Sequence, residues 1–448
     1  MKRIVILGAA ESGVGAAILA QKKGFEVFVS DMGQIKDSYK QMLSDACISW
    51  EEGGHTAEKI LTATEVIKSP GIPEEAPMIV ALRQQGTPVI SDIEFAARYT
   101  KARMVCITGS NGKTTTTSLI YHILREAGYD VGLAGNIGRS FALQVAERER
   151  DWYVLELSSF QLDNMYEFRA NVAVLLNITP DHLDRYGFEM QRYVDAKMRI
   201  LQNMQSDDSF IYWDEDDYVP AEIAKRQPTC QLLPFSDDPQ AGEAACGGET
   251  VNVSRPKAFS IAAKELPIPG KHNQRNVMAA ALAALCCEVD RAILSAAIKS
   301  FPGVEHRLER VAEVNGVTYI NDSKATNVDA CFCAMQSVEA PVVLILGGKD
   351  KGNDYEQIRD ITREKCRALV FLGADNTKLK DFFADSPLPQ RDTHTIEACV
   401  AACAELAQPG DTVLLSPCCA SFDLFNGMAE RGRKFKEQVN KLRVTSDK

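Results

Sequence analysis

The chain has 448 residues, which is too long for one hydrophobic core and predicts about three domains. It is 45% hydrophobic and 25% charged, as globular proteins usually are, and no apolar run approaches the ~18 residues that cross a bilayer. The net charge of -11 disfavours a nucleic-acid partner or an anionic membrane surface. The 13 cysteines lack metal-ligand spacing and are predicted to be free thiols, as in a reducing cytoplasm.

The first unit, residues 1–92, opens as a βαβ motif. We expect a strand over 2–7, a glycine-bearing turn over 8–15, a helix over 16–23 and a second strand that ends at Asp31. Such a turn lies at the carboxyl edge of a parallel sheet, where these folds bind ligands. Its sequence, GAAESGVG, is not the dinucleotide fingerprint. The glycines therefore serve either a ligand or the close packing of helix on strand, and the spacing favours neither.

The middle unit, residues 93–302, carries the strongest motif. The stretch MVCITGSNGKTTTT at 104–117 predicts an apolar strand, a glycine loop and a helix that opens on Lys113. The backbone N–H groups of such a loop, with a helix N-terminus behind them, bind a phosphate chain. Lys113 would neutralise the terminal phosphates, and the Thr114 hydroxyl would bind Mg²⁺. The full Walker pattern has glycine where Ile107 stands, so a plain glycine-rich turn is the alternative.

Two polar groups follow predicted strands of this unit. Glu156 interrupts the apolar strand 152–157, where a carboxylate is costly unless a cation meets it. Mg²⁺ held from the other side by Thr114 would be that cation, and a salt bridge at a sheet edge is the alternative. The strand 172–178 leads into a T-P-D-H segment, in which we favour His182 as a metal ligand over a helix start capped by Thr179.

A lysine stands in the middle of an apolar helix face. Lys197 shares this face with Met190, Tyr193, Val194, Ile200, Leu201 and Met204. Such a lysine either snorkels to solvent or has a specific role. If it points toward two Mg²⁺ ions, charge repulsion and desolvation lower its pKa and leave a neutral amine. That amine takes up CO₂, and the resulting carbamate supplies oxygen ligands that suit Mg²⁺.

The rest of the middle unit is less informative. Residues 206–263 form short β runs between acidic and glycine-rich turns, and we expect no more of them than a cover over the nucleotide. An alanine-rich helix follows over 277–287, and Asn273 is a plausible cap on local grounds.

Residues 303–448 are predicted to form a separate α/β unit. Phe301-Pro302-Gly303 marks the boundary. Apolar strands alternate with helices and predict a parallel sheet, with strands at 317–320, 342–346, 368–372 and 412–415. Polar segments follow three of them, at 321–327, 347–351 and 416–423. Any one of these is usually an ordinary loop, but three at one sheet edge predict a binding site.

These segments together resemble the Mur ligases, which are ATP-dependent amide-bond-forming enzymes. The shortened loop T-G-S-N-G-K-T is shared with the folylpolyglutamate synthases, which lack a separate uridine-binding first domain. E-L-S-S-F-Q-L at 156–162, N-D-S-K-A-T-N at 321–327 and the late S-P-C-C-A-S-F-D resemble the Mur ligases that add D-glutamate. The resemblance covers nearly the whole chain.

The resemblance implies an α/β protein of three domains. Residues 1–92 would be a Rossmann-like domain for a UDP-substrate, residues 93–302 a central P-loop ATPase-type parallel-sheet domain, and residues 303–448 a Rossmann-like D-glutamate domain. ATP would convert the carboxylate of UDP-MurNAc-L-Ala to an acyl phosphate, which the amine of D-glutamate then attacks. The partners would be these small molecules, with no nucleic acid and no membrane insertion, and we expect a cytoplasmic monomer.

The resemblance also assigns residues to each ligand. ATP contacts would be Gly109, Ser110, Asn111, Gly112, Lys113, Thr114, Thr115, Asn273, Asn276, Arg307 and Asp322. UDP-substrate contacts would be Ser12, Gly13, Asp31, Ser69, Pro70, Gly71 and Asn136. D-glutamate contacts would be Thr326, Lys351, Ser421 and the backbone of Phe422. Thr114, Glu156, His182 and a carbamate on Lys197 would hold two Mg²⁺ ions, and the catalytic residues would be Lys113, Glu156, His182 and Lys197.

The sequence departs from this pattern at two places. No arginine follows Asp31, where the family has a diphosphate contact, and Lys36 is the nearest substitute. Met428 stands where the family has an aromatic contact to D-glutamate. A different class of function also remains open: an ATP-gated binding module that holds or hydrolyses ATP without a second substrate.

Overall fold

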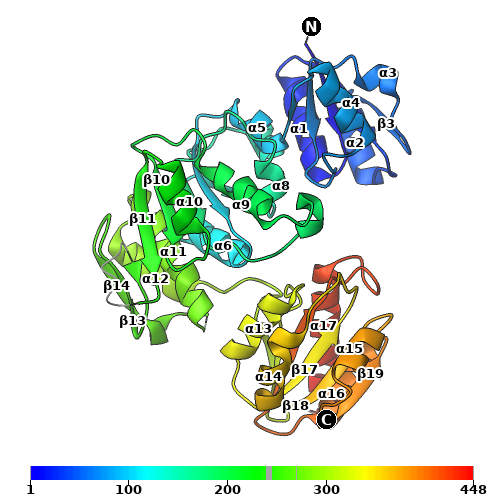
Figure 1. The fold of residues 1–448 in the computed structure, drawn as a ribbon, viewed down its shortest axis with the longest axis vertical. Helices are drawn as coiled ribbons and strands as arrows, with labels where there is room; N and C mark the ends of the chain where they lie inside the picture. The colour runs from blue at the N-terminus through cyan, green and yellow to red at the C-terminus, as the bar shows by residue number, and fades with distance from the viewer. Residues whose placement is uncertain (1, 239–244, 269, 447–448) are drawn as a thin grey trace. The chain divides into compact units, whose positions relative to one another are not determined.

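The computed structural model describes residues 2–238, 245–268 and 270–446, which form three β-sheets with helices between their strands (Figure 1). The chain divides into two compact units, Met1–Pro267 with Asn273–Phe301, and Ile268–His272 with Pro302–Lys448. The first unit holds two of the sheets and the second unit holds the third. The α/β class predicted from the alternating strands and helices is confirmed.

The first sheet has five parallel strands in the order β3-β2-β1-β4-β5. The strands are β1 (Arg3–Leu7), β2 (Glu26–Asp31), β3 (Ser49–Glu52), β4 (Glu65–Lys68) and β5 (Val89–Ile90). The helices are α1 (Glu11–Lys22), α2 (Asp37–Asp45), α3 (Ala57–Ile60), α4 (Pro77–Gln85) and α5 (Asp92–Ala97). β1 pairs with β2 on one side and with β4 on the other, so the strand order reverses beside β1. Such a switch point places a ligand crevice at the carboxyl ends of these strands.

The glycines of the first turn serve packing. Helix α1 begins at Glu11, so the expected helix start at residue 16 is wrong. A Cβ at Gly13 would lie 1.9 Å from the carbonyl oxygen of Gly8, and one at Gly15 would lie 2.1 Å from Oγ of Ser140. Only glycine allows the helix this close to its neighbours. Of the two alternatives, the structure therefore supports close packing for these two positions.

The second sheet has nine strands in the order β14-β13-β12-β11-β10-β9-β6-β8-β7. Its strands are β6 (Arg103–Thr108), β7 (Val131–Gly135), β8 (Trp152–Glu156), β9 (Val172–Leu175), β10 (Ser209–Trp213), β11 (Gln231–Ser236), β12 (Ala245–Cys246), β13 (Thr250–Val253) and β14 (Phe259–Ala262). They are parallel from β7 to β12, and the last two pairings are antiparallel. The short β runs predicted within residues 206–263 therefore belong to the same sheet as β6, the strand that leads into the glycine loop.

Helices cover this sheet (Figure 1). They are α6 (Lys113–Glu126), α7 (Phe141–Glu147), α8 (Ser159–Leu162), α9 (Met190–Met198), α10 (Val219–Arg226), α11 (Lys271–Cys286) and α12 (Arg291–Ser300), with short 3-10 helices η1 (Leu183–Tyr186), η2 (Arg199–Leu201) and η3 (Ala263–Glu265). Among the described residues, none of the helices combines the length and apolar content that a membrane crossing needs.

The second unit has a six-stranded sheet in the order β15-β16-β20-β17-β18-β19. Its strands are β15 (Glu309–Val314), β16 (Val317–Asn321), β17 (Val342–Gly347), β18 (Cys366–Leu372), β19 (Gln390–Thr393) and β20 (Thr412–Cys418). Its helices are α13 (Val328–Ser337), α14 (Glu356–Lys365), α15 (Thr377–Phe382), α16 (Ile396–Leu406) and α17 (Met428–Ser446). The four predicted strands are present and parallel, and β15 adds an antiparallel edge that the sequence analysis did not foresee.

Alternate residues of the central strands face two hydrophobic layers. Leu344 and Leu346 of β17 pack with residues of α13 and α14. Val343 and Ile345 pack with residues of α16 and α17. Because both faces are covered, the strand ends are where polar loops emerge, and the three predicted polar segments lie there.

Candidate active site

The loop between β6 and α6 forms a tight turn into a helix N-terminus. The N–H of Ser110 donates to the carbonyl oxygen of Asn177 at 2.9 Å, and the N–H of Asn111 donates to the side-chain oxygen of Asn177 at 2.8 Å. Gly112 has φ +83°, and a Cβ there would lie 2.4 Å from Oδ1 of Asn276. The loop therefore leads directly into the N-terminus of α6, which is the backbone arrangement that binds phosphate groups in proteins.

Lys197 lies directly beside this loop. Its Nζ donates to the carbonyl oxygen of Gly109 at 2.8 Å and lies 4.6 Å from the ring centre of Tyr193. The side chain is 1% exposed, so the snorkelling alternative is wrong. Burial lowers the pKa of Lys197 well below its ordinary value, and the nearby charge of Lys113 lowers the pKa further.

Lys113 turns back onto the loop that precedes it. Its Nζ donates to the carbonyl oxygens of Gly109 and Ser110 at 2.7 and 2.9 Å. A flexible lysine in this position can exchange such carbonyl contacts for an anionic partner, because a charged acceptor binds an ammonium more strongly than a carbonyl does.

Glu156 presents a buried oxygen that fits a cation. Its Oε1 accepts a hydrogen bond from the side-chain amide of Asn136 at 2.9 Å, and the residue is 1% exposed. Among the described residues, neither Oε2 of Glu156 nor Oγ1 of Thr115 has a hydrogen-bond partner. The described part of the chain also offers Glu156 no salt bridge, which disfavours the sheet-edge alternative. A hard oxygen donor left open beside a phosphate loop fits Mg²⁺.

His182 lies on a strained turn beside Asp181. It has φ +53°, its Nε2 lies 3.6 Å from Oδ2 of Asp181, and its ring meets Phe160 edge-on at 5.2 Å. The helix that follows begins at Leu183, so a start capped by Thr179 is wrong. The N–H and the carbonyl oxygen of Thr179 instead bond the hydroxyl of Ser110, which ties this segment to the phosphate loop.

The structure thus gathers several predicted groups around Gly109. Lys113 and Lys197 bond its carbonyl, and Asp181 and Glu156 lie close enough to Lys197 to raise its pKa against the effect of burial. This set of lysines and carboxylates beside a helix N-terminus can bind a charged phosphoryl group and the metal ion that accompanies it.

Asn273 and Asn276, two of the predicted ATP contacts, lie inside helix α11. The helix begins at Lys271, so the expectation that Asn273 caps a helix starting near residue 277 is wrong. Nδ2 of Asn276 donates to Oδ1 of Asn273 at 3.1 Å, and Oδ1 of Asn276 accepts from the Thr116 hydroxyl at 3.2 Å. In this structure the pair fixes the start of α6 against α11.

A cavity of about 640 Å³ lies at the carboxyl edge of the first sheet. Its lining is Leu7, Gly8, Ala10, Asp31, Met32, His55, Ser69, Gly71, Ile72, Pro73, Ala76, Pro77, Met78 and Ile79. Three predicted contacts, Asp31, Ser69 and Gly71, are among these residues. The other four, Ser12, Gly13, Pro70 and Asn136, and the proposed substitute Lys36, are not.

Asp31 and His55 are the ionisable groups among the described residues of that lining. The Asp31 carboxylate accepts from the N–H groups of Ala9 and Gly33 at 2.6 and 2.8 Å. His55 was missed by the sequence analysis, and its Nδ1 lies 2.7 Å from Oγ of Ser30. Its position just after the third parallel strand was the available signal.

Arg431 ties together the three polar segments of the second unit. It is 1% exposed, and it donates from Nε to Oγ of Ser323 at 3.0 Å, from Nη2 to the Ser323 carbonyl at 2.8 Å and from Nη1 to the Cys419 carbonyl at 3.1 Å. A longer contact of 3.4 Å reaches the Gly347 carbonyl. Arg431 could not be singled out from the sequence, because arginines on helices are mostly exposed.

The predicted D-glutamate contacts surround this tie. The hydroxyl of Ser421 is buried without a hydrogen-bond partner among the residues that the structure describes. Lys351 and Phe422 are exposed, and Thr326 is half-buried. Met428 opens α17, and its carbonyl oxygen accepts from the Ser323 hydroxyl at 2.8 Å.

Asp322 is a buried carboxylate beside Arg307. It accepts from the N–H of Leu308 at 3.2 Å and from the hydroxyl of Ser416 at 2.9 Å. Burial raises its pKa to about 6, and the charge of Arg307 opposes this rise. Nε of Arg307 has no hydrogen-bond partner in the described part of the chain, which leaves a donor for a ligand.

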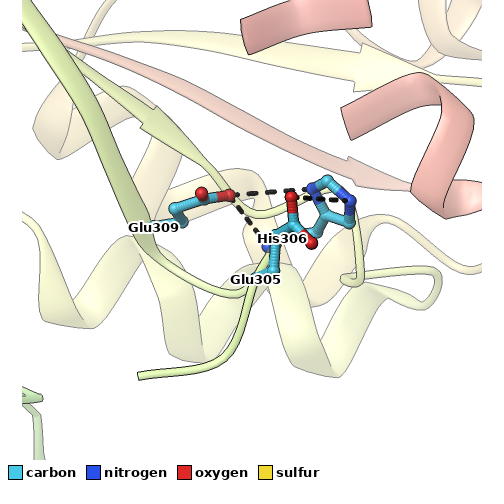
Figure 2. Close-up of side chains that lie close together, drawn as sticks. All are labelled: Glu305, His306 and Glu309. Atoms are coloured by element: carbon cyan, nitrogen blue, oxygen red, sulfur yellow. Dashed lines mark hydrogen bonds and ion pairs between the residues drawn. The ribbon is translucent and has the colours of Figure 1, made fainter. Parts of the chain in front are cut away.

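Glu305, His306 and Glu309 cluster on the turn that carries Arg307 (Figure 2). Nδ1 of His306 lies 3.7 Å from Glu309, and the His306 N–H donates to Glu309 at 3.0 Å. The ammonium of Lys436 already bonds both carboxylates, at 2.9 and 2.5 Å. The cluster is therefore an ion-pair network that fixes the turn, and it offers no open metal site.

Comparison with known proteins gives three consecutive family matches. Residues 3–78 match the MurD N-terminal domain, residues 107–284 the Mur ligase middle domain, and residues 306–419 the Mur ligase glutamate ligase domain. Solved Mur ligases share the fold: UDP-N-acetylmuramate-alanine ligase MurC from Thermotoga maritima has a TM-score of 0.62 at 17% identity, over 98% of this chain and 99% of that one. MurF ligase from Thermotoga maritima in complex with ADP has a TM-score of 0.62 at 15% identity, over 96% and 99%.

Curated relatives are much more similar in sequence. A protein of Bacteroides thetaiotaomicron named UDP-N-acetylmuramoylalanine--D-glutamate ligase is 58% identical over 99% of this chain and 100% of its own length. A protein of Porphyromonas gingivalis with the same name is 50% identical over 98% of each chain. The chain therefore belongs to the UDP-N-acetylmuramoylalanine--D-glutamate ligases of the Mur ligase family.

Proposed function

We propose that this chain is the ATP-dependent ligase that adds D-glutamate to UDP-N-acetylmuramoyl-L-alanine in peptidoglycan precursor synthesis. The observation that carries the proposal is the meeting of Lys113, Lys197 and Glu156 around the phosphate loop. A carboxylate is a poor electrophile, and ATP activates it as an acyl phosphate. A site with the Lys113 cation and an open carboxylate oxygen that fits Mg²⁺ meets the negative charge that this step concentrates.

Residues of the loop after β6 and of helix α6 bind the phosphates of ATP in this proposal. The α6 N-terminus and Lys113 hold the phosphate chain, with Gly109, Ser110, Asn111 and Gly112 shaping the loop. Arg307, Asp322, Asn273 and Asn276 are the further proposed nucleotide contacts.

Metal ligation is proposed for the oxygen donors beside this loop. Mg²⁺, when bound, offsets the negative charge of the phosphates. We assign Thr114 and Glu156 to one ion, and His182 with Lys197 to a second. The unpartnered Oε2 of Glu156 supports this assignment.

Lys197 carries a carbamate in the working enzyme. A neutral amine attacks CO₂, forms an N–C bond and releases one proton, so that the amine becomes an anionic oxygen ligand. The burial of Lys197 and the proximity of Lys113 favour the neutral amine that this step needs.

The remaining substrate contacts lie in the first and last domains, 1–92 and 303–448. Asp31, Ser69 and Gly71 contact the uridine nucleotide in the 640 Å³ cavity that they line. Ser12, Gly13 and Pro70 are the further proposed contacts to this nucleotide. Asn136 contacts the muramoyl part. Thr326, Lys351, Ser421 and the Phe422 backbone contact D-glutamate, with Lys351 on a substrate carboxylate. We further propose that the enzyme acts as a cytoplasmic monomer.

The product identifies the function. Incubation with ATP, UDP-N-acetylmuramoyl-L-alanine and either D- or L-glutamate should give, by mass spectrometry, one added glutamyl residue with the D-isomer only. Addition of L-glutamate to a folate instead would support the folylpolyglutamate synthase alternative. ATP hydrolysis with no glutamyl product would support the binding-module alternative.

Lys351→Ala tests the D-glutamate site. The KM for D-glutamate should rise at least tenfold, because a charge-assisted contact is lost, whereas the KM for ATP should stay within twofold. An unchanged KM for D-glutamate would remove Lys351 from the site.

A further inference from the structure

We propose that Tyr355 sets the spacing between the Lys351 loop and the Ser421 loop and thereby selects the length of the amino dicarboxylate. The inference rests on the proposed function, in which these loops hold D-glutamate. The Lys351 loop is defined here as residues 347–353, after β17, and the Ser421 loop as residues 418–423, at the end of β20.

Asp350 shapes the Lys351 loop from within. Its Oδ1 accepts from the N–H groups of Gly352 and Asn353 at 2.6 and 3.1 Å, which closes a turn around Lys351. The ammonium of Lys378 bonds the same oxygen at 3.0 Å. Although burial opposes it, these hydrogen bonds and that of Tyr355 keep the pKa of Asp350 below its ordinary value, so the group is an anion that only accepts.

The hydrogen-bond directions follow from this anion. The Tyr355 hydroxyl lies 2.6 Å from Oδ2 of Asp350, and burial raises the pKa of Tyr355, so its single proton goes to Asp350. Sγ of Cys419 lies 3.2 Å from the same hydroxyl oxygen. Burial raises the pKa of Cys419 to about 11, so it remains a thiol and donates to Tyr355.

Tyr355 therefore joins the two loops through one oxygen atom. Asn353 adds a second crossing, because its Nδ2 donates to the Cys418 carbonyl at 3.1 Å and lies 3.3 Å from Sγ of Cys419. Tyr355 is 2% exposed and Cys419 is 1% exposed, so water does not compete for these bonds.

The consequence concerns the two carboxylates of the substrate. Lys351 follows Asp350 directly, and Ser421 lies two residues after Cys419. A fixed distance between the Asp350 turn and the Cys419 backbone fixes the distance between the backbones of Lys351 and Ser421, and this limits the span between the ammonium and the hydroxyl. A site with two anchors at a fixed spacing favours a diacid of one length, and a loosened spacing lowers this discrimination.

Tyr355→Phe tests the inference, because it removes one hydroxyl and keeps the ring that packs in the core. The KM for D-glutamate should rise about tenfold, as expected for one buried hydrogen bond at a charged group, with kcat within about twofold. The ratio of kcat/KM for D-glutamate over D-aspartate and over D-2-aminoadipate should fall about tenfold as well. A role in stability alone would lower Tm without changing this ratio.

Tyr319→Phe is the matched control. Tyr319 is equally buried in the same unit, but it packs in the layer beneath α16 and α17, away from both loops. It should leave the substrate ratio unchanged. If Tyr355→Phe does not fold, Cys419→Ala is the second variant. It removes the hydrogen bond between Cys419 and Tyr355 and should lower the same ratio.

The outcomes separate the two proposals. If Lys351→Ala raises the KM for D-glutamate while Tyr355→Phe and Cys419→Ala change neither KM nor the diacid ratio, the spacing role of Tyr355 is wrong and the site stands. If Lys351→Ala also leaves KM unchanged, the D-glutamate site itself is misplaced. A fall in the diacid ratio for Tyr355→Phe but not for Tyr319→Phe supports the spacing role.

Discussion

Lys113 and Lys197 donate to the same atom, the carbonyl oxygen of Gly109, at 2.7 and 2.8 Å. Two ammonium groups this close repel each other, and only Lys113 has access to solvent. Burial and the charge of Lys113 therefore lower the pKa of Lys197 well below its ordinary value. This relationship accounts for a lysine in the middle of an apolar helix face.

Lys197→Met should be almost inactive but at least as heat-stable as the wild type. Methionine keeps the length and fills the apolar site without the cost of burying an amine. Initial rates should fall by a factor of about 100 or more, because a group facing the phosphoryl transfer is lost, and scanning calorimetry at pH 7.5 should show an unchanged or higher Tm.

The proposed carbamate on Lys197 predicts that lost activity can be restored in two ways. Lys197→Ala should regain part of its rate with acetate, which brings a free carboxylate, and wild-type enzyme depleted of CO₂ should regain activity with bicarbonate. Full activity of Lys197→Ala would contradict the carbamate. So would a mass spectrum of the native protein, recorded in saturating bicarbonate, that lacks the extra mass of one bound CO₂.

Gly13→Ala should destabilise the first unit strongly. The new Cβ would meet the Gly8 carbonyl at 1.9 Å, and backbone on both sides cannot move as a side chain would. We expect a loss of about 3 kcal/mol or more, measured as the shift in the denaturant midpoint. Gly54→Ala is the control, because its Cβ meets nothing within 4 Å, and it should change stability by less than about 0.5 kcal/mol. Equal effects of the two changes would refute the packing role.

Asp92→Asn should stabilise the protein at neutral pH and not at acid pH. Asp92 is 3% exposed, and burial raises its pKa from 3.8 to about 6. Between these values the folded state keeps a proton that the unfolded state has lost, so this carboxyl's contribution to stability falls as pH rises through that window. The two pKa values differ by about 2 units, which corresponds to about 3 kcal/mol above pH 6.

The check on Asp92 is a pair of melting curves. The Tm of Asp92→Asn should exceed that of the wild type at pH 7.5, and the difference should shrink at pH 4.5. A Tm difference of the same size at both pH values would show that the carboxyl does not titrate as its burial implies.

Arg431→Lys should raise the KM for D-glutamate and lower Tm. The guanidinium reaches Ser323 and Cys419 with several donors in a fixed plane, whereas an ammonium cannot span both segments. Buried carbonyl groups left without donors cost about 1–3 kcal/mol each. Kinetics at varied D-glutamate and a melting curve measure the two effects. A variant with wild-type KM and Tm would contradict the role of Arg431 as a tie.

Most of the fold and of the candidate phosphate site could be predicted from the sequence, and particular residues show why the rest could not. Lys197 was visible because helical spacing put a charge on an apolar face, where burial has consequences. Asn273 was misassigned because capping is a local signal, whereas α11 starts at Lys271. Arg431 and Tyr355 could not be predicted because Ser323, a partner of Arg431, and Cys419, a partner of Tyr355, lie far away in sequence, and only the folded sheet brings them together.

The most direct test of the account is the dependence of ADP release on each substrate. With ATP and Mg²⁺, the purified protein should release ADP at a substantial rate only when UDP-N-acetylmuramoyl-L-alanine and D-glutamate are both present, and omission of either should reduce the rate to background. ADP release at the full rate with ATP and Mg²⁺ alone would contradict a ligase and would support an ATP-gated module.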